Sequence, residues 1–353
     1  MARAERAGSD GGDVNGFRVV LVLTLLAGAS AAEARAGGDG AACPDGGAPV
    51  TTLAHGSRYA GDGSDRADLN PAADAAVEAA LAPIDAAIEE LAEAANDART
   101  GEAAGKAGCV IETLHRWAAA DALRELRTVN AQLSAPARVG GFALAYLQVA
   151  PAARAADPDR ARRIERWLAD RARASARWFD REARPRSRGN NLRAWAGLAA
   201  GAAGLAADDP ALIGWAAETV RVVACAADAD GALPHEMDRG KRALQYQLHA
   251  VAPLVTTAAL LEPAGHALFA ACGGALHRAV DFIPRAFAEP GLVRGKAGAA
   301  QLLLTGGDRL APHDLAWAEI YLARFPSAPL AALAAPFDSL AHSKLGGAQA
   351  GLW

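Results

Sequence analysis

The sequence predicts an all-α protein, and two observations carry that prediction. Hydrophobic residues make up 52% of the 353-residue chain, and much of this share is alanine, in long stretches with few β-branched residues that favour helix. Leu and Trp recur within the alanine at helical spacing, whereas no stretch alternates with period two for long enough to predict a sheet. Repeated antiparallel helix pairs favour an α/α toroid, an incomplete α/α barrel around a groove. The rival, an α-solenoid, would show a fixed repeat, and we find none.

The individual helices follow from apolar spacing and from the breaks between them. From Pro71 to Leu91, apolar residues recur at helical spacing, which predicts a long amphipathic helix that Pro83 kinks or divides. Further helices are predicted over 109–127, 140–154, 158–179, 191–207, 209–227, 241–261, 266–285 and 313–324. Breaks are predicted at Pro151, Pro158, Pro185, Gly231, Pro263 and Pro290.

The N-terminus has the pattern of an export signal. Three arginines precede an apolar run over 19–29, and small residues follow it. The run is too short to span a membrane and is typical of a secretory signal that is cleaved after Ala31 or Ala36. A retained N-terminal anchor is the alternative. We expect a signal peptide over 1–36, a single domain over 37–353, and a periplasmic or secreted mature chain without a membrane segment.

Charge and cysteine usage exclude several classes of protein. The net charge of −4 argues against a nucleic-acid binder, which normally carries a strong basic excess, whereas a polyanionic glycan needs only a local basic cleft. The four cysteines, at 43, 109, 225 and 272, lack the short paired spacing of zinc sites. We therefore expect no metal site and no cofactor. An oxidising compartment permits disulfides, and the spacing leaves open whether Cys225 and Cys272 are bonded or are buried free thiols.

The most informative pattern lies between residues 190 and 246. Asn190 and Asn191 open an aromatic-bearing helix, and Arg239 and Tyr246 follow, seven residues apart. If that stretch is helical, a guanidinium and a phenol leave one face, two turns apart, and share a cleft. These groups suit β-elimination from a uronic-acid polymer, because amide and guanidinium donors neutralise a carboxylate as charge flows into it. Nearby positive charge favours the phenolate, which can take a proton and later return it.

Structural interpretations of the same residues stay open at this point. An asparagine is a good helix cap, and both interpretations hold if Asn190 caps the helix while Asn191 faces the cleft. Arg239 stands among other basic residues, which is also typical of a solvated helix face. Its spacing from Tyr246 favours a role for Arg239 in the cleft over a solvated helix face.

Four other side chains are candidates for contact with a ligand. Tyr59 lies in a loop rich in Gly, Asp and Ser, where an aromatic ring either closes over a ligand or packs at the loop edge. Trp195 is either a sugar platform or a core residue one turn into the active-site helix. His235 is a candidate donor in the loop before the basic cluster. His249 is either a surface residue of its helix or a second imidazole near the cleft.

Taken together, these segments resemble the alginate lyases of polysaccharide lyase family five. The resemblance covers most of the mature chain and implies the α/α toroid. Residues 57–64 with 68–70 are similar to that family's lid loop, 117–123 to its early core helix, 190–195 to the start of its active-site helix, 233–246 to its catalytic helix, and 317–319, 336–339 and 345–347 to its C-terminal segments.

The resemblance also implies roles for individual residues. Tyr246 would be the base and the acid of a metal-independent elimination, and Asn191 and Arg239 would neutralise the carboxylate. Arg58 and Tyr59 would contact the substrate from the lid, with Asn190, Trp195 and His235 nearby. A disulfide between Cys43 and Cys109 is implied as well.

The chain departs from the family at three positions around this groove. Leu192 replaces a histidine that follows the paired asparagines, His235 replaces an asparagine, and Ala137 lies in place of a basic-aromatic segment. Two functions are therefore expected. One is an exported lyase for mannuronate-rich alginate or a related uronate-containing exopolysaccharide, in which one tyrosine serves both steps. The other is a non-catalytic or nearly inactive glycan-binding relative that accompanies exopolysaccharide secretion machinery.

Overall fold

A computed structural model gives the structure of residues 43, 45–61, 65–101 and 105–352. The signal peptide expected over 1–36 and residues 62–64 of the expected lid loop lie outside these described residues. The chain divides into two units, Met1–Gly38 and Asp39–Trp353, and every described residue belongs to the second.

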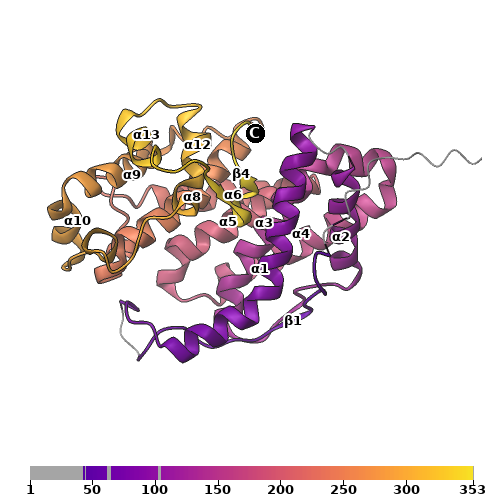
Figure 1. Cartoon of the computed structure of the whole chain (residues 1–353), viewed down its shortest axis with the longest axis horizontal. Coiled ribbons are helices and arrows are strands. Elements are labelled where there is room, and N and C mark those ends of the chain that lie inside the picture. The colour runs from indigo at the N-terminus through magenta and orange to yellow at the C-terminus, as the bar shows by residue number, and fades with distance from the viewer. Residues whose placement is uncertain (1–42, 44, 62–64, 102–104, 353) are drawn as a thin grey trace, which may run out of the picture. The chain divides into compact units, whose positions relative to one another are not determined.

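Helices dominate the second unit, so the all-α prediction is confirmed (Figure 1). The α-helices are α1 (Pro71–Thr100), α2 (Lys106–Ala119), α3 (Val129–Ala156), α4 (Pro158–Arg181), α5 (Asn191–Ala206), α6 (Pro210–Ala224), α7 (Pro234–Met237), α8 (Ala243–Leu261), α9 (Ala271–Ala288), α10 (Pro290–Ala297), α11 (Leu302–Thr305), α12 (Ala316–Leu322) and α13 (Ala328–Ala334). The 3₁₀ segments are η1 (Pro185–Gly189), η2 (Gly240–Arg242), η3 (Pro312–Leu315) and η4 (Ser343–Leu345). Two-residue strands form two small sheets: β1 (Thr52–Leu53) pairs in parallel with β2 (Glu125–Leu126), and β3 (Ala341–His342) pairs antiparallel with β4 (Gly347–Ala348).

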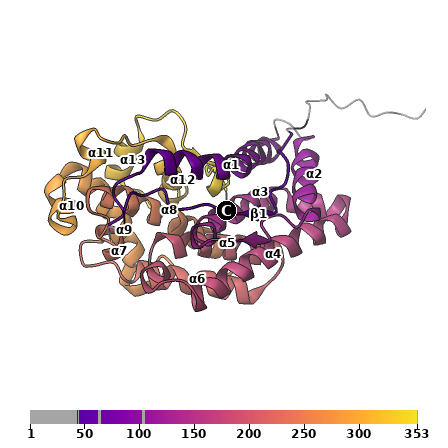
Figure 2. The ribbon, with the colours of Figure 1, turned by 90° about the horizontal axis from the view of Figure 1, so that it is seen from below.

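The long helices form two concentric layers, which is the α/α toroid that the sequence predicts. In the inner layer α1, α3, α5, α8 and α12 each pack against the next, and in the outer layer α2, α4, α6 and α9 do the same. The C-terminal η4 and β4 return to α1. Figure 2 shows α1 and the outer α4 and α6 on opposite sides of α5. No helix of the described residues is long and apolar enough to cross a membrane.

Residue patterns explain which helices lie inside. The inner α5 is buried around almost its whole circumference, whereas α4 buries one apolar stripe and turns its arginines outward, as expected for core and surface helices. Aromatic rings join the layers: the centroid of the Phe142 ring lies 4.8 Å from that of Trp117 and 5.4 Å from that of Trp167.

Side-chain caps fix where several helices begin. Asn70, Thr128, Asp157, Asn190 and Asp209 accept hydrogen bonds from the first free backbone N–H groups of α1, α3, α4, α5 and α6. Each such cap stabilises its helix by about 1 kcal/mol. The caps at Thr128 and Asn190 matter most here, because the starts of α3 and α5 line the site described below.

Several boundary predictions are wrong, including the helix predicted over 109–127, which ends at Ala119 as α2 and is followed by β2. The helix predicted over 140–154 begins at Val129, and the predicted break at Pro151 does not occur, because α3 contains Pro136 and Pro151 in its interior. A proline inside a helix costs about 3 kcal/mol, but α3 packs against its inner-layer neighbours α1 and α5 and against the outer α2 and α4, which hold it in place. The helix predicted from 266 becomes regular only after Cys272, Gly273 and Gly274, which all have positive φ.

Two disulfides tie segments of the fold together. Cys43 is bonded to Cys109 at the start of α2, the pair implied by the family resemblance. Cys225, at the end of α6, is bonded to Cys272, so the question that spacing left open is answered in favour of a second bond.

Candidate active site

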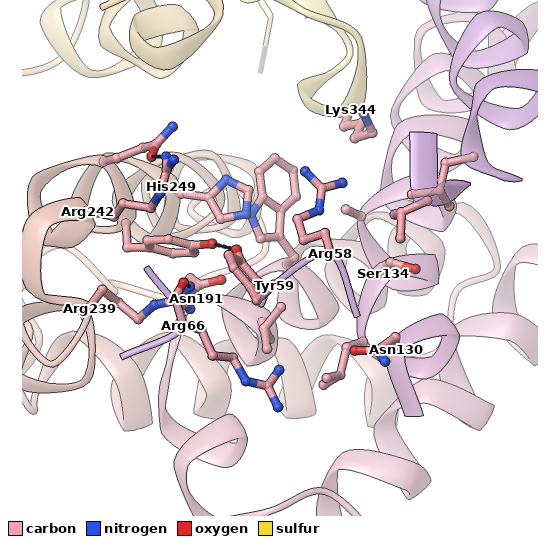
Figure 3. A pocket seen from close by; sticks show the side chains of 18 of the residues that line it. Arg58, Tyr59, Arg66, Asn130, Ser134, Asn191, Arg239, Arg242, His249 and Lys344 are labelled. Carbon is pink, nitrogen blue, oxygen red and sulfur yellow. Dashed lines mark hydrogen bonds between the residues drawn. The ribbon is translucent and has the colours of Figure 1, made fainter. Parts of the chain in front are cut away.

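A cavity of about 660 Å³ lies where the inner helices and their connecting loops meet (Figure 3). Its walls come from six parts of the chain: the loop after β1, the first half of α1, the first turns of α3, the start of α5, the segment from Arg239 into α8, and the C-terminal residues around η3 and η4. Distant segments therefore converge on one space, as expected for a toroid whose helix ends surround a groove.

The cavity carries a strong positive charge. Among the residues that the structure describes, its lining includes the six cations Arg58, Arg66, Arg138, Arg239, Arg242 and Lys344, and the two carboxylates Asp308 and Asp314. Arg242 pairs with Asp308 at 2.9 Å, and Arg138 pairs at 2.6 Å with Asp85. No ion pair joins Arg239 to a carboxylate within the described residues. A polyanion can therefore enter a space whose cations are only partly neutralised.

Arg239 and Tyr246 meet in this cavity, although not in the way the sequence suggested. The expected continuous helix is wrong, because Arg239 follows α7 and precedes η2, whereas Tyr246 lies in the first turn of α8. The turn folds the guanidinium back onto the phenol, and its central carbon lies 3.6 Å from the centre of the Tyr246 ring. The same carbon lies 5.3 Å from the Tyr59 ring, and Arg239 Nη2 donates to the Arg66 carbonyl at 2.9 Å.

The phenol of Tyr246 is neutral in this resting structure. Burial, followed by the nearby Tyr59, raises the pKa of Tyr246 above its ordinary value, and Arg239 opposes that rise. The hydroxyls of Tyr59 and Tyr246 are in direct hydrogen-bonding contact. The expectation that positive charge alone would favour the phenolate is therefore incomplete, because desolvation of the phenol outweighs the charge of Arg239.

Asn190 and Asn191 have different roles in the structure: Asn190 caps a helix, and Asn191 lines the cavity. The Asn190 side chain accepts from Leu192 N at 3.0 Å and caps α5, and Asn190 does not line the cavity. Asn191 does line it. Its backbone N–H and its Nδ2 donate to the two carboxylate oxygens of Glu236, each at 2.7 Å, while its Oδ1 is buried without a hydrogen-bond partner.

A row of rings continues the wall beyond Tyr246. The centroid of the His249 ring lies 6.1 Å from that of Tyr246 and 5.2 Å from that of Trp195, which in turn lies 5.6 Å from His342. His249 exposes its ring to the cavity, yet desolvation by the surrounding protein, helped by Lys344, lowers its pKa to about 4. The indole Nε1 of Trp195 is buried without a hydrogen-bond partner. At neutral pH this part of the wall therefore consists of uncharged aromatic rings.

Leu192 contributes an apolar patch to the same wall. It lines the cavity and packs, with Leu133, against the cluster of Trp178, Phe179, Ala183 and Ala196. The side chain is therefore part of a packed apolar surface.

The structure does not bring every candidate to the cavity. His235 lies outside it, with 42% of its side chain exposed and its ring 3.8 Å from Asp238. Arg58 and Tyr59 both line it, and Arg58 also pairs with Asp74 at 3.4 Å. Lys241, exposed and paired with Asp68, fits the solvated-face interpretation of the basic cluster.

Sequence reasoning missed several lining residues. Arg66, Arg138, Arg242, His313, His342 and Lys344 all reach the cavity. Lys344 directly precedes the segment 345–347 that resembles the family, but nothing in one sequence indicates that it lines the same cavity as Asn191. Glu236 was missed as well, because its neighbours His235 and Asp238 are polar and the sequence gives little sign that its carboxylate is buried.

A basic cavity with a phenol, an amide and a guanidinium at its centre, set into an α/α toroid, defines the class as a polysaccharide lyase. The chain belongs to the alginate lyase family, whose model matches residues 50–292.

Known proteins support this assignment along most of the chain. A polysaccharide lyase of Stenotrophomonas maltophilia is 33% identical over 319 residues, which cover 88% of each chain. An alginate lyase of Azotobacter vinelandii is 30% identical over 83% of this chain and 78% of its own. Among solved structures, alginate lyase A1-III of Sphingomonas species A1 is 24% identical with a TM-score of 0.70, covering 85% of this chain and 83% of its own. A variant of that enzyme complexed with a tetrasaccharide gives a TM-score of 0.74. These two structures establish the shared fold.

Proposed function

We propose that this protein is an exported lyase that cleaves mannuronate-rich alginate or a related uronate-containing exopolysaccharide by β-elimination. The observation that carries the proposal is the Arg239 guanidinium held 3.6 Å from the centre of the Tyr246 ring in a cavity rich in cations. Arg239 and Asn191 neutralise the carboxylate of the sugar at the cleavage site, and Tyr246 moves the proton.

The reaction balances with Tyr246 as the single proton carrier. The phenolate takes the proton from the carbon next to the carboxylate, and the freed electron pair forms a carbon–carbon double bond as the glycosidic C–O bond breaks. The phenol then returns the proton to the departing oxygen, so the phenolate is restored. Because burial raises the pKa of Tyr246, the first phenolate is costly, and Arg239 against the ring is the group that stabilises it.

The apolar wall at Leu192 favours one substrate configuration. In polymannuronate the abstracted proton and the leaving oxygen lie on the same side of the ring, so Tyr246 serves both steps and needs no second base. An epimer attacked from the opposite face meets Leu192 and its apolar neighbours, which offer no proton acceptor. We therefore expect a preference for mannuronate.

Export is part of the proposal. A signal-like N-terminus and two disulfides, Cys43–Cys109 and Cys225–Cys272, support a periplasmic or secreted protein, because disulfides persist in oxidising compartments. A protein in that location could act together with an exopolysaccharide secretion system.

The test is a panel of acidic polymers assayed for the ultraviolet absorbance of unsaturated uronate ends, with wild type and Tyr246→Phe. We expect cleavage of polymannuronate by wild type and none by the Phe variant, which keeps the ring under Arg239 and loses only the hydroxyl. Substantial turnover by Tyr246→Phe would exclude Tyr246 as the base. Binding of one or more polymers, without new absorbance from any polymer of the panel, would instead identify a non-catalytic glycan-binding protein.

A further inference from the structure

Glu236 is a fully buried carboxylate, and within the described part of the chain Asn191 is the residue that donates hydrogen bonds to it. It is 1% exposed, lies in the short helix α7, and accepts both of its strong hydrogen bonds from Asn191, at 2.7 Å from the backbone N–H and 2.7 Å from Nδ2. These bonds connect positions 45 residues apart in the chain, and Asn191 lines the cavity whereas Glu236 does not. Within the described residues, Asn191 is therefore the cavity-lining residue to which the Glu236 carboxylate is hydrogen-bonded.

Two hydrogen bonds from one residue fix the orientation of its amide. A flip of the Asn191 amide would place Oδ1 against a carboxylate oxygen, and two acceptors repel each other. Ionised Glu236 thus holds the amide with Nδ2 toward itself. Protonated Glu236 carries an O–H donor and no longer enforces that orientation.

We propose that Glu236 is a positioning residue whose proton is coupled to occupancy of the cavity: it orients Asn191 in the free protein and takes up a proton when a uronate carboxylate binds beside Asn191 and Arg239. This inference rests on the proposed function, because it takes the ligand to be a uronate chain. The geometry of the Glu236–Asn191 pair carries it.

The charges around Glu236 support the coupling. Burial raises the pKa of Glu236 to about 7, and the hydrogen bonds from Asn191 and the charges of Arg239 and Arg186 work against that rise. The charge of Glu236 in turn contributes to the raised pKa of the Tyr246 phenol on α8, so these two groups interact electrostatically. A bound carboxylate adds negative charge nearby and engages Arg239, so it raises the pKa of Glu236 further. Near neutral pH, that shift means proton uptake on binding.

The first experiment is the pH profile of kcat/KM on polymannuronate. Glu236→Gln keeps the shape of the side chain and stands in for the protonated form that the proposal assigns to the complex, so we expect kcat to change by less than about twofold. Wild-type kcat/KM should decline as the pH rises above about 7, because binding then requires a proton from water, and Glu236→Gln should lose that decline. A decline that survives in Glu236→Gln would overturn the proposal. If Glu236→Gln does not fold, Glu236→Asp, which keeps a titratable carboxyl group, should retain the decline with a shifted midpoint, and an unshifted midpoint would overturn the proposal.

The second experiment needs no turnover and so separates this inference from the proposed mechanism. Mannuronate oligomers are titrated calorimetrically into Tyr246→Phe protein at pH 7 in two buffers of different ionisation enthalpy. We expect a fraction of a proton to be taken up per ligand, and Glu236→Gln in the same background to abolish that uptake, whereas uptake by His249 or His342 would survive the change. Uptake that is absent, or unchanged by Glu236→Gln, contradicts the inference even if wild type cleaves the polymer.

Discussion

The central carbon of the Arg239 guanidinium lies over the Tyr246 ring, 3.6 Å from its centre, although Arg239 lies between α7 and η2 and Tyr246 lies in α8. The η2 turn between them replaces the regular helix that would have separated them by roughly 10 Å along the axis. This contact places a permanent cation against the group that has to become an anion, and the buried setting strengthens the interaction.

Loss of this cation should lower the rate more than the affinity. We expect Arg239→Ala to reduce kcat by about a hundredfold or more, as with loss of an oxyanion donor, because the carboxylate gathers most charge in the transition state. Arg239→Lys should recover little, since an ammonium lacks the planar fork.

Steady-state kinetics on polymannuronate measure both effects. Lys241→Ala is the matched control, because Lys241 is exposed, pairs with Asp68 and does not line the cavity. A change confined to KM would show that Arg239 is only a general anchoring charge.

The helical layers could be predicted from the sequence because they depend on local patterns. Alanine-rich stretches with periodic Leu and Trp define α5 and α8 without reference to the rest of the chain. The errors fall where packing overrides a local rule, as at Pro151 inside α3, or where a few residues leave the helical conformation, as between Arg239 and Tyr246.

The cavity could be predicted only in part. Asn191, Arg239 and Tyr246 lie within 56 residues of one another and resemble one family motif, whereas Lys344 comes from the far end of the chain. Its approach depends on how the C-terminal segment packs against α1 and α3. The balance of burial and charge at Tyr246 likewise follows from the folded surroundings.

The disulfide between Cys43 and Cys109 should stabilise the protein substantially. It closes a loop of 66 residues, and replacing both cysteines by serine should lower the free energy of unfolding by about 2–5 kcal/mol. The Cys225–Cys272 bond spans 47 residues, so its removal should cost a similar amount.

Urea denaturation of the two paired variants measures these costs. Mass analysis of the unreduced protein first tests whether the bonds are present. An unchanged denaturation midpoint for the Cys43→Ser, Cys109→Ser protein would rule out a stabilising role for that bond.

Acid should destabilise the protein through His249. Its pKa, about 4 in the folded protein, lies below the ordinary value near 6.5. Below pH 6.5 the His249 imidazole is therefore protonated in the unfolded chain but stays neutral in the folded protein. Stability from this residue is therefore complete above pH 6.5 and is lost as the pH falls toward 4.

Melting temperatures of wild type and His249→Gln across this range isolate the effect. The Gln variant should lose less stability on acidification, while His115→Gln, a histidine on α2 outside the cavity, should follow wild type. Parallel curves for wild type and His249→Gln would show that the imidazole is not held neutral.

Leu192→His tests whether the cavity has been rebuilt around an apolar wall. Leu192 packs with Leu133 against Trp178, Phe179 and their neighbours, so an imidazole there would face apolar surroundings and leave a ring nitrogen without a partner, at a cost of about 1–3 kcal/mol. We expect a lower melting temperature and no gain in cleavage of polymannuronate.

The melting temperature and the ultraviolet assay have to be read together for this variant. Leu192→Met, which keeps an apolar side chain of similar volume, is the matched control and should retain both stability and activity. Faster cleavage of polymannuronate by Leu192→His at an unchanged melting temperature would show that the wall still accommodates an imidazole. In that case the leucine has weakened an otherwise intact site, and the mannuronate preference argued from the apolar wall would have to be abandoned.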